Sequence, residues 1–232
     1  MIKAVFFDFY GTLAQFHPPR EDIQAGACAS FGFKPTREGL VRGYVMADDL
    51  MSQVNASETR MSQLVGQGRV RFFAEYERLI LRGAGIAVDL ETAERVWEKV
   101  QEIPHGLALF DDALPVLDML KQRELTIGML SNIGRDAQEL SDELGLSPYL
   151  DFAVTSQEVE ASKPHPPMFL MALQRAEVEP EEALHVGDSV LSDVQGARGV
   201  GINPLLLDRE GVMDNVNDCP KIDSLLGVLE YL

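Results

Sequence analysis

The stretch Val5-Phe6-Phe7-Asp8-Phe9-Tyr10-Gly11-Thr12-Leu13 places an apolar run of β-branched and aromatic residues directly before a carboxylate and a glycine. Such a run is typical of a buried strand, and it ends on Asp8. Open α/β sheets bind ligands outside the carboxyl ends of their strands, so Asp8 would face a site and could act as a nucleophile. An aspartate after a strand can also cap a helix. These residues favour the catalytic role and leave the capping role open.

After Pro104 the pattern alternates between strands and helices, which is typical of a parallel sheet with helices on both faces. We expect strands at residues 125–130, 152–155, 183–186 and 203–207. We expect helices at residues 135–144, 167–176, 190–200 and 224–232. The run at residues 3–7 is the first strand and must join this sheet.

Between about residue 12 and residue 106 the pattern is helical instead, because apolar positions recur at spacings of three and four, as at Phe72, Tyr76 and Ile80. Helices are expected at residues 20–31, 36–53, 70–82 and 90–103, with Thr36 and Asp89 at helix starts. No further parallel strand is expected in this segment. The sequence therefore predicts an α/β fold, in which a Rossmann-like parallel-sheet core carries an inserted α-helical bundle. The core would be residues 1–15 and 105–232, and the insert residues 16–104.

The composition excludes several classes of protein. A net charge of −17 repels phosphate backbones and anionic lipids, so we expect no nucleic acid partner and no membrane partner. An anionic substrate would need a cation beside it, which favours a divalent metal. Cys28 and Cys219 lie far apart, without a metal-binding or disulfide pattern. With no apolar run of membrane-spanning length and no leader before the first strand, a cytoplasmic location is expected.

Polar residues also follow later strands. Ser131-Asn132 closes the strand at residues 125–130, where a hydroxyl and backbone N–H groups can hold a phosphate or carboxylate oxygen. Lys163 lies in a proline-fixed loop, and Gly187-Asp188-Ser189 with Asp193 sets two carboxylates about one helical turn apart. Each has an ordinary alternative, a helix cap for the serine and the aspartates and a surface position for the lysine. Their occurrence together, in this order, is hard to explain as separate coincidences.

Together these motifs resemble those of the haloacid dehalogenase-like hydrolase superfamily, in order and across the whole core. The family's first motif is a strand followed by Asp-x-Asp-x-Thr; Asp8 and Thr12 match it, and Tyr10 replaces the second Asp. The second motif is a strand ending in Ser or Thr, the third is a Lys, and the fourth is Gly-Asp-x(4)-Asp. These are matched by Ser131, by Lys163, and by Asp188 with Asp193. The helical insert is similar to the family's small α-helical cap.

The resemblance implies a hydrolase that forms a covalent intermediate on Asp8, and most directly a Mg²⁺-dependent phosphatase of a small phosphorylated metabolite. Mg²⁺ would bind Asp8, the backbone carbonyl of Tyr10 and Asp188, while Asp193 would bind through water or stand behind the other ligands. The resemblance assigns catalysis to Asp8, Ser131 and Lys163, and phosphate binding to Gly11, Thr12, Ser131, Asn132 and Lys163. The cap would close over the site and select the substrate.

Two other functions stay open at this point. Asp-x-Tyr-Gly-Thr is similar to the first motif of metal-independent 2-haloacid dehalogenases, but those enzymes replace Gly187-Asp188 with a Ser-x-Asn type of sequence. Their halide-binding arginine has no recognisable counterpart, although Arg20 or Arg42 could serve. The third function is that of a catalytically weak relative that binds a ligand or a partner protein, because Tyr10 cannot act as a carboxylate acid and base. The sequence identifies neither the small-molecule substrate nor the choice between monomer and homodimer.

Overall fold

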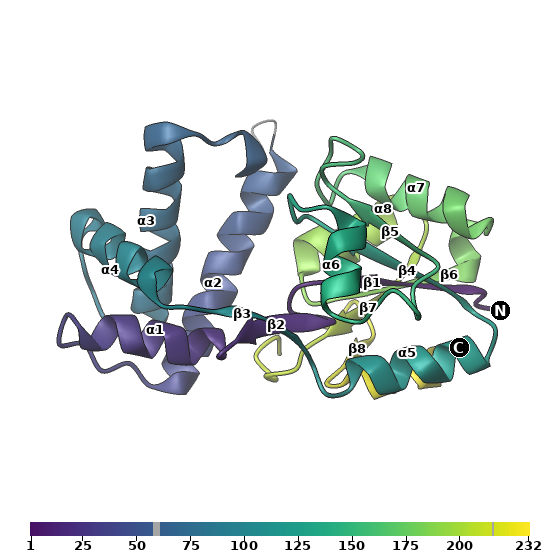
Figure 1. Ribbon diagram of the computed structural model, residues 1–232, viewed down its shortest axis with the longest axis horizontal. Coiled ribbons are helices and arrows are strands. Elements are labelled where there is room, and N and C mark those ends of the chain that lie inside the picture. Colours follow the sequence, from purple (N-terminus) through teal and green to yellow (C-terminus); the bar gives the residue numbers. More distant parts are fainter. Residues whose placement is uncertain (58–60, 215) are drawn as a thin grey trace. The chain divides into compact units, whose positions relative to one another are not determined.

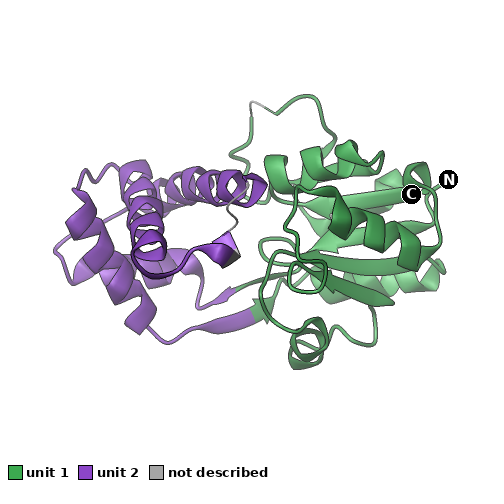
Figure 2. Cartoon of the chain, turned by 90° about the horizontal axis from the view of Figure 1, so that it is seen from above, with its two compact units in different colours: residues 1–15, 108–232 green, residues 16–107 purple. Residues whose placement is uncertain are grey.

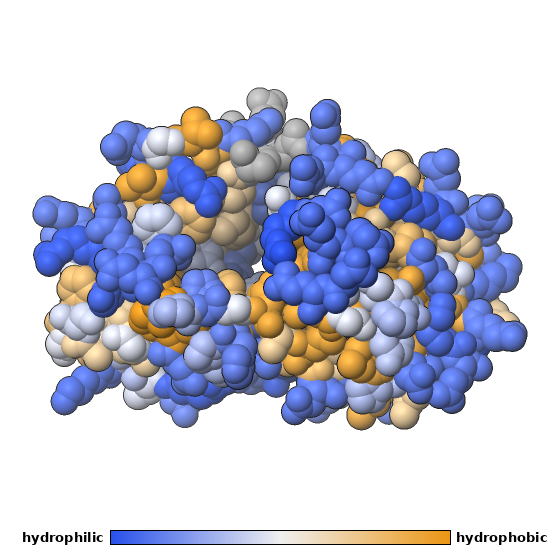
Figure 3. Space-filling view, viewed as in Figure 1, coloured by the Kyte–Doolittle hydropathy of each residue, from blue (hydrophilic) through white to orange (hydrophobic). Residues whose placement is uncertain are grey.

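The computed structural model describes residues 1–57, 61–214 and 216–232. Within it the chain forms two compact units (Figure 1, Figure 2). We call residues 1–15 with 108–232 the sheet unit and residues 16–107 the helical unit. Hydrophilic side chains cover much of the face drawn in Figure 3, with apolar residues between them. None of the helices in the described part of the chain combines the length and the apolarity needed to span a membrane.

The sheet unit is built on a parallel sheet, whose strand order among the described residues is β5-β4-β1-β6-β7-β8. The strands are β1 (Ala4–Asp8), β4 (Thr126–Ser131), β5 (Phe152–Thr155), β6 (Ala183–Gly187), β7 (Asn203–Leu207) and β8 (Lys221–Ile222). Because they run in one direction, their carboxyl ends meet at one edge. The strand order reverses at β1, which is where open α/β sheets bind ligands. The predicted α/β fold class is confirmed.

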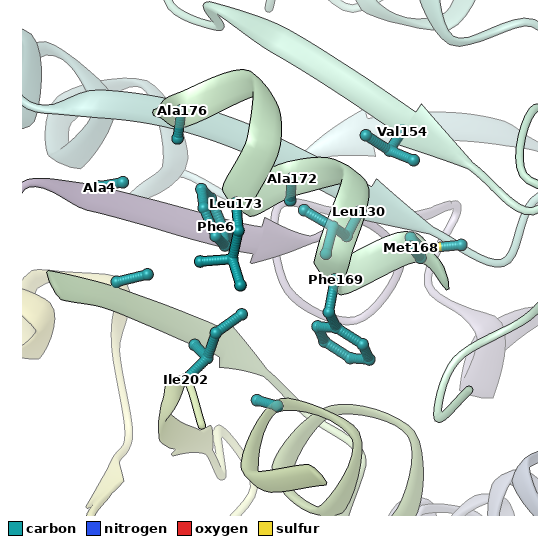
Figure 4. Packing of buried hydrophobic residues seen from close by; sticks show 12 residues of the cluster. Ala4, Phe6, Leu130, Val154, Met168, Phe169, Ala172, Leu173, Ala176 and Ile202 are labelled. Atoms are coloured by element: carbon teal, nitrogen blue, oxygen red, sulfur yellow. The ribbon is translucent and has the colours of Figure 1, made fainter. Parts of the chain in front are cut away.

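Helix α7 (Pro166–Ala176) packs on one face of this sheet through an apolar stripe (Figure 4). The stripe consists of Met168, Phe169, Ala172, Leu173 and Ala176. Its members recur at helical spacing and therefore share one side of the helix. Ala4 and Phe6 of β1 lie in the same cluster, because alternate residues of a strand point to one face. This packing anchors the strand that ends in Asp8.

Helices lie on both faces of the sheet, with α7 and α8 on one side and α5 on the other (Figure 1). The bounds of the remaining helical segments are α5 (Ala113–Gln122), α6 (Ala137–Glu143), η2 (Pro180–Glu182), η3 (Val190–Gln195), α8 (Gly196–Gly199) and η4 (Leu225–Tyr231). The prediction of one α-helix at residues 190–200 was wrong: η3 is a π-helix, and α8 follows it. The wider turn accompanies a hydrogen bond of 3.0 Å from the Ser189 N–H back to the Asp193 carboxylate. The closing segment η4 is a 3₁₀ helix.

Three elements of four or more residues that the structure contains are not predicted by the sequence, and neither is the two-residue strand β8. β2 (Ala14–His17) and β3 (Gly106–Leu109) pair into a two-stranded sheet where the chain passes between the two units. Each strand has only four residues, which is too short for a clear alternating pattern. The third element is α5, whose first turn holds Pro115, a position at which helices accept proline.

The helical unit contains α1 (Arg20–Ala29), α2 (Arg37–Ala56), η1 (Met61–Gln63), α3 (Gly66–Gly83) and α4 (Leu90–Glu102). The four helices expected in this segment are confirmed, with shifted ends. The Thr36 hydroxyl and the Asp89 carboxylate each accept the backbone N–H three residues ahead, at 3.1 and 2.9 Å, and so cap α2 and α4. Helices α2 and α3 approach closely at Gly43, where an added Cβ would lie 2.2 Å from the carbonyl oxygen of Ile80.

A buried carboxyl group lies in the core of the helical unit. Glu77 of α3 is 1% exposed, and its Oε1 accepts a hydrogen bond of 2.5 Å from Gln24 Nε2 of α1. The Tyr44 hydroxyl donates to Gln24 Oε1 at 3.2 Å. Burial raises the pKa of Glu77 from its ordinary 4.5 to about 8, against a smaller lowering by the Gln24 hydrogen bond. Glu77 is therefore mainly protonated in the folded protein at neutral pH.

Replacing Glu77 with glutamine should remove a pH dependence from the stability of the helical unit. Because the pKa of Glu77 is higher in the folded chain than in the unfolded chain, its contribution is full below about pH 4.5 and is lost as the pH rises to about 8. The free energy of unfolding of the variant, relative to wild type, should rise by up to about 1.4 kcal/mol per pH unit in that window. Trp97 is the chain's only tryptophan and lies in α4, so its fluorescence during urea unfolding reports on this unit.

Glu75→Gln is the matched control, because the Glu75 carboxylate lies on the same helix and pairs with Arg78 at 2.7 Å near the surface. It should leave the pH dependence of the wild type in place. A stability difference between Glu77→Gln and wild type that stays constant from about pH 5 to about pH 8 would contradict a neutral, buried Glu77.

Candidate active site

The strand ends of the sheet unit bring the predicted residues to one edge. Asp8 is the last residue of β1 and pairs with Leu130 of β4. Ser131 is the residue after Leu130. On the other side of β1, Phe7 pairs with Val186 of β6. Gly187 is the next residue and ends that strand, and Asp188 follows it. Three neighbouring strands thus deliver a carboxylate, a hydroxyl and a second carboxylate to the same edge of the sheet.

Lys163 is 1% exposed and lies between two carboxylates. Its Nζ is 2.5 Å from Asp8 Oδ1 and 2.7 Å from Asp193 Oδ1. The lysine loop is held by Asn132, whose Oδ1 accepts the Lys163 N–H at 2.7 Å and whose Nδ2 donates to the Lys163 carbonyl at 3.1 Å. The side chain of Asn132 therefore orients Lys163, and any contact of residue 132 with a substrate would come from its backbone.

The pKa values of Asp8, Asp193 and Lys163 are shifted differently, although Lys163 contacts both carboxylates. Burial raises the pKa of Asp8 to about 6, against the lowering effect of Lys163 and with a further rise from the Asp193 charge. Burial also acts to raise the pKa of Asp193, but Lys163 and a hydrogen bond from His185 hold it well below its usual range. Burial tends to lower the pKa of Lys163, and the two carboxylates raise it above its ordinary value. Asp193 and Lys163 therefore form a firmly charged pair, and Asp8 is the carboxylate whose charge is least stabilised.

His185 of β6 is a buried neighbour of this pair that the sequence interpretation missed. Its Nε2 lies 2.9 Å from Asp193 Oδ1, and burial lowers the pKa of the imidazole, so the ring is neutral and donates this hydrogen bond. Its Nδ1 has no hydrogen-bond partner among the described residues. The available signal was a single polar residue in the apolar run Ala183-Leu184-His185-Val186, since buried polar residues are the informative exceptions in a strand.

Asp8, Asp188 and Asp193 form a cluster whose possible ligand atoms all lie within 4.8 Å of one another. Gly11 makes the close approach possible: its φ is +87°, and an added Cβ would lie 2.1 Å from Asp188 Oδ2. At Gly187 an added Cβ would lie 2.2 Å from Asp193 Cγ. Carboxylate oxygens are the ligands that Mg²⁺ prefers, so this donor set fits the ion. Asp193 Oδ1 accepts hydrogen bonds from Lys163 and His185, and its Oδ2 accepts one from the Ser189 N–H. Because both oxygens are engaged in this way, Asp193 is suited to supporting the other metal ligands.

The remaining predicted residues lie in the turn that follows Asp8, residues 9–14, which we call the nucleophile turn, and beside it. The Thr12 side chain is fully buried, and its Oγ1 has no hydrogen-bond partner among the described residues. The Ser131 hydroxyl, also buried, accepts the Ile133 N–H at 3.2 Å. Tyr10 is half-buried and forms an isolated β-bridge with Ala14. Ser131 is therefore placed at the edge of the sheet, whereas Thr12 supports the turn from inside.

Residues 2–201 match the family model described as haloacid dehalogenase-like hydrolase, a span that includes all the motifs above. The chain belongs to the haloacid dehalogenase-like hydrolase family. This hydrolase is 35% identical over 141 residues to mouse haloacid dehalogenase-like hydrolase domain-containing protein 3, covering 60% of this chain and 56% of the relative. It is 33% identical over 103 residues to ribulose-1,5-bisphosphate 5-phosphatase of Halopiger xanaduensis, covering 44% of this chain and 43% of that protein's length. The chain spans about half the length of these curated relatives.

A solved structure with the same fold is a 2-haloacid dehalogenase from Pseudomonas syringae pv. Tomato. The TM-score is 0.58 at 24% identity, over 99% of this hydrolase and 97% of that chain. This likeness shows the fold alone. The site residues, and not the fold, must therefore discriminate between phosphate and halide chemistry.

Proposed function

We propose that this haloacid dehalogenase-like hydrolase is a Mg²⁺-dependent phosphatase of a small phosphorylated metabolite, with Asp8 as its nucleophile. The cluster of Asp8, Asp188 and Asp193 is the observation that carries the proposal. Carboxylates at this spacing repel one another, and Lys163 offsets only part of their charge. A divalent cation would supply the rest and, when bound, polarise a phosphoryl oxygen.

The residues of the site would share the work of a two-step transfer. An Asp8 carboxylate oxygen attacks phosphorus, the bond from phosphorus to the leaving oxygen breaks, and that oxygen takes up a proton. Water then attacks the phosphorus of the aspartyl phosphate, which releases inorganic phosphate and restores Asp8. Lys163 donates to both Asp8 and Asp193, and its third N–H can reach a phosphoryl oxygen. Ser131 would bind a second phosphoryl oxygen with its hydroxyl.

Tyr10 limits the leaving groups that this enzyme should accept. Family phosphatases keep a carboxylic acid at this position, and a phenol with an ordinary pKa of about 10 is a poor substitute as acid and base. The backbone carbonyl of Tyr10 can still bind the metal, since any residue supplies that atom. We therefore infer a preference for phosphates with good leaving groups, unless the helical unit provides the acid.

The helical unit is proposed as the cap that selects the substrate. It is inserted directly after the nucleophile turn, and the chain leaves and returns to the sheet unit through the paired strands β2 and β3. We also propose that the protein acts in the cytoplasm, as a monomer or homodimer, without a nucleic acid or membrane partner. The net charge of −17 and the unpaired, buried Cys28 and Cys219 support this setting.

The test is hydrolysis of p-nitrophenyl phosphate and acetyl phosphate by the purified protein. We expect turnover with added Mg²⁺, loss of turnover with a chelator, and recovery when Mg²⁺ is restored in excess. A screen of phosphorylated metabolites would then identify the substrate, with alkyl phosphates expected to react more slowly. Inorganic phosphate release is the measurement.

The competing function is that of a 2-haloacid dehalogenase, and Tyr10 is the residue that favours it. Such an enzyme would release chloride from 2-chloropropionate in the presence of a chelator. Arg20, one candidate for binding the halide, is engaged by Asp48 at 2.8 Å and lies 4.2 Å from the ring centroid of Tyr44. Chloride release without metal, and no phosphate release with it, would overturn the phosphatase proposal.

A further inference from the structure

Arg209 lies two residues beyond the end of β7 and contacts two other segments of the sheet unit, one at residues 110–112 and one at Thr12. Its Nη1 and Nη2 lie 2.9 Å from Oδ2 and Oδ1 of Asp112. Nη2 also donates to the backbone carbonyl of Thr12 at 3.0 Å. The guanidinium carbon stands 3.9 Å from the centroid of the Phe110 ring. With a side chain 18% exposed, Arg209 is too enclosed for an ordinary surface ion pair.

The partner of Arg209 is itself fixed. The Asp112 carboxylate accepts hydrogen bonds of 2.9 Å from the Ser224 hydroxyl and from the Leu225 N–H. Burial acts to raise the pKa of Asp112, but these bonds and Arg209 lower it below its ordinary value. Asp112 is therefore a charged anchor tied to the last segment of the chain, and the bidentate pair sets the plane of the guanidinium.

The carbonyl that Arg209 binds belongs to the nucleophile turn, residues 9–14. Within this turn the Leu13 and Ala14 N–H groups both donate to the Phe9 carbonyl at 2.9 Å, and the Gly11 N–H donates to the Ala14 carbonyl at 2.8 Å. These bonds are internal to the turn. The Arg209 bond to Thr12 instead ties the turn to an anchor elsewhere in the sheet unit.

We propose that Arg209 is a positioning residue for the nucleophile turn. By holding the Thr12 carbonyl, it fixes the turn in which Gly11 passes beside Asp188 and in which the Tyr10 carbonyl follows Asp8. The expected effect on turnover rests on the proposed phosphatase function, because small displacements of groups around a reacting centre can lower rates about 100-fold. The expected effect on the turn itself does not depend on that function.

The experiment compares Arg209→Gln, Arg209→Lys and the matched control Arg198→Gln by hydrogen exchange and by kinetics. Arg198 also pairs with an aspartate of the sheet unit, Asp218, but at the surface. In Arg209→Gln we expect amide exchange at residues 10–14 to accelerate at least about 10-fold. We expect kcat to fall about 10- to 100-fold with a smaller change in KM. Arg209→Lys should recover part of both effects, and Arg198→Gln should show neither.

Unchanged exchange at residues 10–14 in Arg209→Gln overturns the proposal, whatever the activity. Accelerated exchange that extends to β5, on the far side of the sheet from β7, also overturns it, because the role would then be general stability. Accelerated exchange confined to the turn supports the proposal even if no phosphate ester is hydrolysed, in which case only the proposed function fails. Should Arg209→Gln not fold, exchange in Arg209→Lys and in Asp112→Asn decides by the same criteria.

Discussion

Replacing Asp8 with asparagine is expected to abolish hydrolysis while the protein stays folded. The amide has nearly the same shape as the carboxylate, and its oxygen can still accept the hydrogen bond from Lys163 that Asp8 Oδ1 accepts at 2.5 Å. It cannot form the acyl phosphate, because a neutral amide is not a competent nucleophile. Loss of a nucleophile costs on the order of 10⁴-fold or more in kcat. Turnover of acetyl phosphate with Mg²⁺, together with the far-ultraviolet circular dichroism of the variant, measures both parts of this expectation.

The matched control is Asp118→Asn on α5, where the carboxylate is exposed and accepts a hydrogen bond of 2.6 Å from Gln122. This variant should keep wild-type kcat and KM. Isolation of a phosphorylated wild-type peptide that contains residue 8, absent from Asp8→Asn, would identify the intermediate directly. Retained turnover in folded Asp8→Asn would remove Asp8 from the mechanism and with it the proposed covalent route.

Much of the sheet unit could be predicted because apolar runs and their polar ends carry strong local signals. The strands at residues 152–155 and 203–207 agree with the structure at both ends, and β1 and β6 differ only at their margins. In a parallel sheet the ends of neighbouring strands meet, so Asp8, Ser131 and Asp188 could be grouped from sequence order alone. Lys163 could be included only through the family resemblance, because a lysine in a loop carries no positional signal of its own.

What the sequence does not reveal depends on tertiary contacts. The π-helical turn of η3 accompanies a carboxylate that turns back to a backbone N–H, which no periodicity encodes. His185 stands in an apolar run, and its purpose emerges only when Asp193 is found beside it. Arg209 and Asp112 are 97 residues apart, and neither belongs to a motif. Strands β2 and β3 are short and depend on each other for pairing, so neither has an independent sequence pattern.

Replacing Lys163 with methionine is expected to disrupt both stability and turnover, because it leaves Asp8 and Asp193 adjacent without a counter-charge. Both carboxylates are buried, and the lysine side chain that separates them is only 2% exposed. Breaking a buried ion pair by removing one partner costs about 3–5 kcal/mol, since the remaining charges are left without compensation. Urea unfolding followed by circular dichroism at neutral pH, with a chelator present so that bound metal does not mask the loss, should show this decrease.

Two further variants separate charge compensation from simple loss of packing. Lys121→Met removes a lysine that pairs with Asp151 at 2.7 Å, with side chains 36% and 38% exposed, and should cost less than about 1 kcal/mol. Lys163→Met combined with Asp193→Asn should be more stable than Lys163→Met alone, because one of the two adjacent charges is gone. The double variant should still hydrolyse nothing, since Lys163 is also the proposed phosphate ligand. If the second substitution instead lowered stability further, packing and not charge would be the main contribution of Lys163, and the electrostatic account of this site would be wrong.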